Sequence, residues 1–295
     1  MCCQTDTQKV MAPSSSRWGK QKISQEGSNP LLSASGGCQG CAGEDASVAS
    51  AQPGASPACA GLERNEVTGS MEIRYRHEVK HYLNWSDLMS IRARLQAVMQ
   101  PDPHTKDGKY QIRSLYFDNQ ADKALREKID GVNLREKFRI RYYNGDTSFI
   151  HLEKKSKHNS LGTKYDALLS AGEAQKIVEG DTGWMLSSGR PLVQELYVKM
   201  KYQGLRPRTI VDYTREPFIY GPGNVRVTFD YDIRTGLSCT DFLNPDAVTI
   251  SAGERVILME VKWDAYLPSV IRDLVQTKGR RSTAFSKYAI CRIYD

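Results

Sequence analysis

The chain has 295 residues, a net charge of +7 and a hydrophobic share of 40%. This composition is typical of a soluble globular protein, and no apolar run is long enough to cross a bilayer as a helix. The N-terminus lacks the apolar core of a signal peptide, so we expect a cytoplasmic protein.

Charge and composition divide the chain near residue 70. Residues 1–70 hold 5 Lys and Arg against 6 Asp and Glu, are rich in Ser, Ala, Gly, Gln and Pro, and contain Trp18 as their only aromatic residue. Such a segment cannot bury enough apolar surface to offset the entropy of ordering, so we predict a disordered low-complexity tail over 1–70 and a folded domain over 71–295. The folded part holds 36 basic and 28 acidic residues. This excess predicts an anionic partner, such as a nucleotide, polyphosphate, nucleic acid or lipid headgroup.

The predicted domain begins with a strand and a helix. Residues 72–83 alternate as in a strand, with Glu78 and Lys80 on the same face. Apolar residues at helical spacing then predict a helix over about 86–99, which Pro101 ends.

The rest of the domain is predicted to be rich in strands, with helices between them. The expected strands cover 111–117, 134–143, 148–155, 163–170, 208–213, 224–234 and 256–263. We expect a short helix or irregular link over 118–128, two helices within 171–202, one helix over about 268–277 and a closing segment over 282–294. The basic side chains of the 118–128 segment, Lys123, Arg126 and Lys128, are expected to form a solvated face.

The strand over 134–143 is the most unusual segment, because basic residues occupy one whole face. Its alternation places Phe138, Ile140 and Tyr142 on the opposite face. The four cations are Arg135, Lys137, Arg139 and Arg141. Like charges repel, so this face costs stability unless anions lie between the cations, and Arg is suited to forked hydrogen bonds with phosphate oxygens. The alternative is a half-exposed strand with a solvated basic face.

Glu-x-Lys pairs recur on three predicted strands, and each places a carboxylate and an ammonium group on one face. The pairs are Glu78/Lys80, Glu153/Lys155 and Glu260/Lys262. The turn at 144–146, Asn-Gly-Asp, predicts a hairpin that brings Glu153 and Lys155 beside the four cations. Asp230 ends an alternating run, where an Asp is more often a structural partner of Arg than a metal ligand.

Two architectures suit strands that have one charged and one apolar face. In a sandwich the charged faces would meet water, whereas in a closed barrel they could line the interior, with helices packed outside. The recurring Glu-x-Lys pairs and the density of Arg favour the barrel, whose interior would hold a polyanion and its metal.

Eight short motifs occur in a specific order from residue 76 onward. They are Arg76-His-Glu-Val-Lys-His-Tyr82, Leu115-Tyr-Phe-Asp-Asn119, Arg139-Ile-Arg-Tyr-Tyr143, Glu153-Lys-Lys155, Tyr213-Thr-Arg-Glu-Pro-Phe218, Arg226-Val-Thr-Phe-Asp230, Glu260-Val-Lys262 and Phe285-Ser-Lys-Tyr288. This ordered set resembles the VTC domain, the catalytic domain of the vacuolar transporter chaperone polyphosphate polymerases and their bacterial relatives. The family belongs to the triphosphate tunnel metalloenzymes, also called CYTH-like, and the resemblance covers about residues 71–295.

The resemblance implies an α+β fold, an antiparallel β-barrel tunnel with helices packed outside. It also implies a polyphosphate polymerase that transfers the terminal phosphoryl group of ATP to a growing polyphosphate chain in a basic tunnel. The residues that match phosphate ligands are Lys80, Arg139, Arg141, Lys155, Arg215, Arg226 and Lys287. Glu260 matches the carboxylate that binds Mn²⁺ or Mg²⁺, and Tyr213, Lys262 and Ser286 match supporting ligands.

Two departures from the family pattern leave alternatives open. Arg76 stands where the triphosphatase and cyclase branch has the first Glu of Glu-x-Glu-x-Lys, which argues against that branch. Ala284 stands where the eukaryotic polymerases have a lysine, a place that Arg280 or Arg281 could reach. The alternatives are therefore a non-catalytic module that binds polyphosphate or nucleotide, or a triphosphatase of the same superfamily.

The implied partners are ATP and inorganic polyphosphate. Export of the product would need a separate membrane protein, which could hold this chain at the inner face of a membrane. We expect no nucleic acid partner, because the aromatic residues of the cationic strand point away from its basic face.

Overall fold

The computed structural model describes residues 76–158, 161–253, 256–277, 279 and 281–293. The predicted tail over 1–70 and the first residues of the predicted opening strand lie outside these ranges. Everything below concerns the compact unit Thr68–Asp295.

The described residues contain ten strands in one antiparallel sheet. Eight strands follow one another across the sheet in the order β1-β10-β8-β7-β3-β4-β5-β6, and the two-residue strands β2 and β9 pair with β7 and β8. The bounds are β1 His77–Leu83, β2 Gln100–Pro101, β3 Tyr110–Asp118, β4 Arg135–Tyr143, β5 Asp146–His158, β6 Leu161–Leu169, β7 Arg206–Tyr220, β8 Val225–Thr235, β9 Ile250–Ser251 and β10 Ile257–Trp263.

Six α-helices lie within the described residues. Their bounds are α1 Trp85–Gln96, α2 Lys123–Ile129, α3 Ala171–Glu179, α4 Pro191–Gln203, α5 Ser269–Leu274 and α6 Lys287–Cys291, and 3₁₀ turns cover Gly183–Ser188 and Pro222–Asn224. Helix α1 begins where predicted, because Asn84 and Asp87 form a capping box. Its buried stripe of Leu88, Ile91 and Leu95 is the apolar spacing seen in the sequence.

All eight predicted strands are present, and β7 is much longer than expected. We predicted a strand over 208–213, whereas β7 continues to Tyr220. Pro217 argues against a strand because it lacks a donor, but it lies beyond Arg215, the last residue of β7 that pairs with Tyr110 of β3. Pro217 lies opposite Thr228 of β8, but its carbonyl accepts from Asp102 N at 3.4 Å, so its missing N–H also faces the side of the short strand β2.

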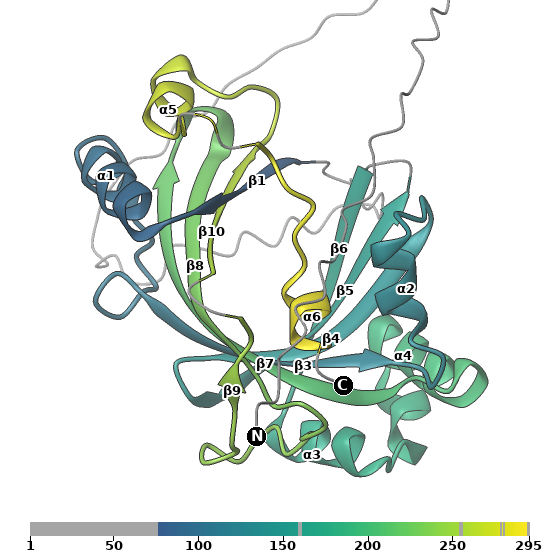
Figure 1. Cartoon of the computed structure of the whole chain (residues 1–295). Coiled ribbons are helices and arrows are strands. Elements are labelled where there is room, and N and C mark those ends of the chain that lie inside the picture. The colour runs from purple at the N-terminus through teal and green to yellow at the C-terminus, as the bar shows by residue number, and fades with distance from the viewer. Residues whose placement is uncertain (1–75, 159–160, 254–255, 278, 280, 294–295) are drawn as a thin grey trace, which may run out of the picture. The chain divides into compact units, whose positions relative to one another are not determined.

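The sheet curls so that its two ends face each other (Figure 1). We call β1, β10 and β8 the first arm, β4, β5 and β6 the second arm, and the inner side of the curl the concave face. A core of Leu88, Ile91, Val227 and Met259 packs α1 and α5 on the outside of the first arm, and a second core packs α3 and α4 on the outside of the second. The predicted fold class, an α+β antiparallel β-barrel tunnel with helices packed outside, is confirmed as a curled antiparallel sheet with helices on its outer side. Strands β1 and β6 remain the two edges of the sheet, so among the described residues the curl is a half-barrel.

The short helix α6 is an exception, because it lies between the two arms (Figure 1). Tyr288 and Cys291 pack with Tyr116, Val211 and other apolar residues of the concave face. We expected only a closing segment over 282–294, and five helical residues are too few to show a helical period.

Polar anchors fix α6 in this position. The Tyr288 hydroxyl donates to Asp118 Oδ2 at 2.8 Å, and Thr283 N donates to the Lys80 carbonyl at 2.8 Å. The C-terminal segment thus forms one wall of the concave space. Within the part of the chain that the structure describes, no helix combines the length and apolar character needed to span a membrane.

Candidate functional site

The charged side chains of the first arm form two rows across its strands. The antiparallel register sets Lys80 opposite Glu260, and Glu260 opposite Thr228. The neighbouring row runs from Glu78 through Lys262 to Arg226. The intervening positions, including Val227 and Val261, belong to the outer core, so strand alternation alone places these rows on the concave face.

Glu260 lies at the centre of the first arm, and its carboxylate meets four cations. Oε1 lies 3.1 Å from Lys287 Nζ and 3.2 Å from Lys80 Nζ, and Oε2 lies 3.3 Å from Lys262 Nζ and 3.5 Å from an Arg215 nitrogen. Burial alone would raise the pKa of Glu260, but these four cations hold it well below its ordinary value. The structure therefore brings four predicted site residues together around Glu260, which is itself a predicted site residue. We call this group the Glu260 cluster.

Asp230 shares two cations, Arg215 and Lys287, with Glu260. Arg215 donates to both oxygens of Asp230 at 2.6 and 2.7 Å, and Lys287 Nζ lies 2.5 Å from Oδ2. Asp230 is fully buried, and the fork fixes the guanidinium in one orientation. The prediction that Asp230 is a structural partner of Arg is confirmed.

The second arm holds Arg139 and Arg141, both buried on the concave face. Arg139 binds Glu153 at 2.5 and 2.6 Å and donates to the Tyr116 hydroxyl at 2.8 Å. Arg141 donates to Ser114 Oγ at 2.8 Å and to the Tyr213 hydroxyl at 3.0 Å. Both guanidinium groups are therefore held in place by side chains of the sheet.

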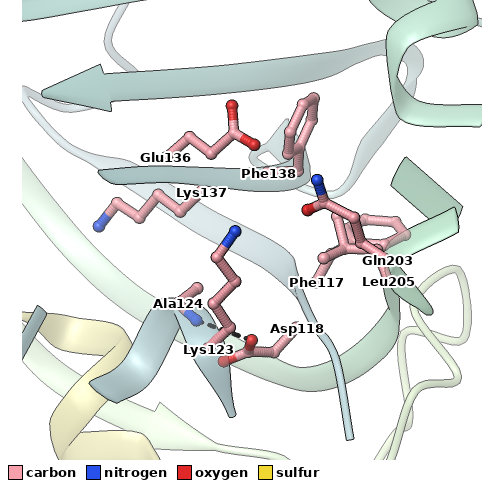
Figure 2. Close-up of a pocket in the computed structure, with 9 residues that line it drawn as sticks. All are labelled: Phe117, Asp118, Lys123, Ala124, Glu136, Lys137, Phe138, Gln203 and Leu205. Carbon is pink, nitrogen blue, oxygen red and sulfur yellow. Dashed lines mark hydrogen bonds between the residues drawn. The ribbon is translucent and has the colours of Figure 1, made fainter. Parts of the chain in front are cut away.

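Lys137 and Lys155 lie on the same arm and form no ion pair with any described residue. Figure 2 shows Lys137 on the opposite side of β4 from Glu136 and Phe138, beside a small cavity of about 20 Å³. Burial, together with the charges of Arg139 and Lys80, lowers the pKa of Lys137 to about 8 against the opposing attraction of Tyr116. These two ammonium groups lie among other cations, and the attraction of Glu78 offsets only part of the burial and repulsion at Lys155.

The two arms face each other closely enough for their charges to interact. Burial lowers the pKa of Lys155 well below its ordinary value, and the next causes are the charges of Lys262 on the first arm and Arg139 on the second. A polyanion between the arms would therefore meet cations on both sides.

Tyr116 is a residue that the sequence analysis missed as part of the site. Its buried ring stacks on Tyr288 with centroids 5.0 Å apart, and its hydroxyl accepts from Arg139. Burial would raise the pKa of Tyr116, but Arg139, Lys137 and Arg141 together lower it to about 7. Its sequence signals were its place in the Leu115–Asn119 motif and its alternation with Leu115 and Phe117, and neither revealed the cations around it.

Lys164 was also missed, although alternation along β6 could have found it. It lies directly opposite Lys155 in the strand register, and its Nζ is 3.0 Å from Glu153 Oε1. Lys164 therefore shares Glu153 with Arg139, so this carboxylate holds more than one cation.

Lys128 was predicted on a solvated face, and this expectation is wrong. Its Nζ donates to the Ala284 carbonyl at 2.6 Å and its side chain is half-buried. Burial lowers the pKa of Lys128, and the charges of Arg135 and Lys80 lower it further. An ammonium group thus lies beside Ala284, whereas Arg281 is exposed and Arg280 lies outside the described residues.

The remaining predicted site residues have narrower roles in the structure. Arg226 lies at the margin of the first arm, where its Nη2 donates to Asp102 at 2.9 Å. Ser286 caps α6, accepting from Ala289 N at 3.4 Å. Tyr213 holds Arg141 by its hydroxyl, and Lys287 lies 4.9 Å from its ring centroid. All three border the concave space, and Ser286 acts mainly on the backbone.

Among the described residues, the predicted metal ligand Glu260 does not belong to a group of side chains that could hold a metal ion. Within the described ranges no three His, Cys, Asp or Glu side chains lie close enough to hold a metal ion. Both oxygens of Glu260 face cations, so these residues do not by themselves fit a resident divalent cation. The binding of Mn²⁺ or Mg²⁺ by Glu260 stays a prediction that depends on oxygen ligands supplied by the substrate.

No curated protein matches the chain. Among solved structures, a candidate adenylate cyclase from Bacillus halodurans is 14% identical, covers 65% of this chain and 80% of that chain, and has a TM-score of 0.38. A candidate adenylyl cyclase from Hippeastrum, described as having a dominant triphosphatase activity, is 14% identical, covers 74% and 94%, and has a TM-score of 0.45. A protein from Pyrococcus horikoshii OT3 is 13% identical, covers 68% and 84%, and has a TM-score of 0.34.

The family comparison agrees with the ordered motifs. The family model of the VTC domain matches residues 75–293, a range that contains both arms and the C-terminal segment, and the chain therefore belongs to the VTC domain family.

Proposed function

We propose that this protein is a polyphosphate polymerase, which transfers the terminal phosphoryl group of ATP to a growing polyphosphate chain. The observation that carries the proposal is the charge arrangement of the concave face. Lys137 and Lys155 form no ion pair among the described residues, Lys137 is repelled by Lys80 and Lys287, and Lys155 is repelled by Lys262 across the curl. A buried surplus of cations costs free energy in the empty protein, and a polyanion removes that cost.

The chemistry of phosphoryl transfer suits such a site. The reaction needs little covalent help, because alignment of the phosphates and neutralisation of charge on the equatorial oxygens supply most of the rate. Arg139 and Arg141 offer rigid forks that their tyrosine and carboxylate partners hold in position. We assign these two guanidinium groups to the phosphoryl group in transfer, with Lys137 and Lys155 binding the adjoining phosphates.

The Glu260 cluster would bind the other side of the chain. Lys80, Lys262 and Lys287 are held near one carboxylate, so their charges are concentrated without being free to move apart. A divalent cation would enter as part of the metal–nucleotide substrate, whose phosphates would supply most of its oxygen ligands. Glu260 is the protein carboxylate that we assign to it.

Product analysis tests the proposal. The purified protein is incubated with ATP and Mn²⁺, and the phosphate products are separated by gel electrophoresis. We expect polyphosphate chains, no products in excess chelator, and a rate about ten- to a hundredfold lower in Arg139→Lys, because a lysine cannot replace the forked contacts.

A matched control and two contrary outcomes complete the test. Arg113 lies on the outer side of β3, where it binds Asp212, so Arg113→Lys leaves the rate per folded molecule unchanged. Free phosphate without chains would indicate a triphosphatase. Nucleotide binding without any turnover would indicate a binding module, and either result would contradict the polymerase proposal.

A further inference from the structure

Thr228 lies in the middle of β8, on the concave face and directly opposite Glu260. Its side chain is 1% exposed, and its Oγ1 has no hydrogen-bond partner among the described residues. A buried hydroxyl that makes no hydrogen bond destabilises the folded state, because it has lost its contacts with water. Thr228 therefore needs an explanation that the empty fold does not supply.

Other buried threonines of the same sheet do not share this feature. Thr209 Oγ1 lies 3.3 Å from Thr235 Oγ1, and Thr235 Oγ1 donates to the Cys291 carbonyl at 3.0 Å. These hydroxyls hold the C-terminal segment against the sheet. The contrast shows that the missing partner is particular to the position of Thr228, since Thr235 lies on the same strand and has partners.

A second buried donor without a partner lies two residues away. Arg226 Nε is buried and has no hydrogen-bond partner among the described residues, although Arg226 Nη2 is held by Asp102 at 2.9 Å. Residues i and i+2 of a strand point to the same side, so the Thr228 hydroxyl and Arg226 Nε are offered to the same space. Asp102 fixes the guanidinium and leaves its Nε available.

The surroundings decide the chemistry of the absent acceptor. Lys262 lies opposite Arg226 in the register, and Lys80 lies beyond Glu260 in the row of Thr228. The carboxylate of Glu260 already has four cationic neighbours. Two unused donors beside this group of cations suit an oxygen that carries negative charge, and a phosphoryl oxygen accepts such bonds strongly.

We propose that Thr228 is a positioning residue that, together with Arg226 Nε, binds one phosphoryl oxygen of the bound triphosphate or polyphosphate chain beside the Glu260 cluster. The inference rests on the proposed function, because the ligand is the same polyanion. It adds a subsite on the first arm, separate from the Arg139 and Arg141 forks on the second. The Thr228 hydroxyl thus stabilises the ligand-bound protein and destabilises the ligand-free protein.

The test uses inorganic tripolyphosphate as the probe and two substitutions at one position. Thr228→Val keeps the shape and removes the hydroxyl, whereas Thr228→Ser keeps the hydroxyl. By calorimetry we expect Thr228→Val to bind tripolyphosphate about tenfold or more weakly than the unchanged protein, and Thr228→Ser to bind nearly as well. Without ligand, Thr228→Val melts at the same temperature or higher, because no hydrogen bond is lost.

The control is the same substitution at a hydroxyl that has partners. Thr209→Val lowers the melting temperature and leaves the tripolyphosphate affinity of the folded protein unchanged. Equal affinity of Thr228→Val and the unchanged protein would overturn the inference and leave the proposed function standing, as would a fall in melting temperature with no loss of affinity. No tripolyphosphate binding by the unchanged protein would overturn the proposed function itself.

Discussion

The two arms of the sheet follow the same alternating pattern but differ in charge balance. On the first arm Glu78, Asp230 and Glu260 each lie within ion-pair distance of at least two cations. On the second arm Glu153 is the buried carboxylate, shared by Arg139 and Lys164, while Lys137 and Lys155 form no ion pair among the described residues. Alternation places charges on the concave face, and the number of carboxylates decides whether that face is already satisfied.

The pKa values of the two arms reflect this difference. On the first arm, burial opposes ionisation of Glu78, but Lys262 and Lys80 lower its pKa to about 2. Burial likewise opposes the charge of Lys80, but Glu260 and Glu78 raise its pKa above the ordinary value. On the second arm, burial lowers the pKa of Lys137 to about 8. Ion pairs thus stabilise the charges of Glu78 and Lys80 in the empty first arm, whereas the charge of Lys137 is destabilised in the empty second arm, as expected of a cation that binds an anion.

The same substitution on each arm would break or sharpen this comparison. Lys80→Met removes a cation from between Glu78 and Glu260, at 2.7 and 3.2 Å, and we expect stability to fall by about 1–2 kcal/mol because two carboxylates lose a partner. Lys137→Met removes a cation that lacks an ion pair, and we expect stability to rise by about 1 kcal/mol. Urea unfolding of the ligand-free proteins at pH 7 measures both changes. A loss of stability in Lys137→Met would contradict the account of the second arm.

The two arms should also differ in how stability changes with pH. Lys137, with a pKa of about 8, and Tyr116, with a pKa of about 7, both bind fewer protons in the folded state than in the unfolded state above these values. Stability therefore rises between pH 7 and pH 9, and the rise is smaller in the double variant Lys137→Met, Tyr116→Phe. On the first arm, the stabilisation by ionised Glu78 is present above pH 4.5 and is lost as the pH falls toward 2.

Unfolding curves at pH 4.5, 7 and 9 measure this behaviour. Glu78→Gln serves as the control on the first arm, since it leaves the rise between pH 7 and pH 9 unchanged. If that rise is the same in the double variant as in the unchanged protein, other groups cause it and the charges of the second arm do not.

The sequence predicted the strands and the side of each strand that carries charge. Arg139 and Arg141 lie on the concave face because their alternation with Phe138 and Ile140 is strict, and burial of the apolar side leaves one choice. The pairing of the β4–β5 hairpin followed from Asn-Gly at 144–145, and it set Lys137 opposite Lys155. Such features depend on neighbours in the sequence, so they can be read without the fold.

The rest of the site depends on contacts between distant residues. Tyr288 meets Asp118 across 170 positions of the chain, and this contact draws α6 to the concave face. Lys128 reaches the Ala284 carbonyl across 156 positions, and the motif around Ala284 gives no hint of this contact. No local pattern encodes these distances, so the placement of α6 and the role of Lys128 required the structure.

The most direct test of the account is the effect of polyphosphate on the melting temperature of Arg141→Ala. Arg141 is buried and is one of four cations on one face of β4. Its hydrogen bonds go to the hydroxyls of Ser114 and Tyr213, and its Nη1 lies 4.0 Å from Glu153 Oε2. We expect the ligand-free variant to melt at the same temperature as the unchanged protein or higher, because a mutually repelling charge has been removed. Polyphosphate and ATP should raise the melting temperature of the unchanged protein and leave that of the variant unchanged. If Arg141→Ala unfolds the ligand-free protein and the remaining folded molecules still bind polyphosphate, Arg141 serves the fold, and the concave face is not the site we describe.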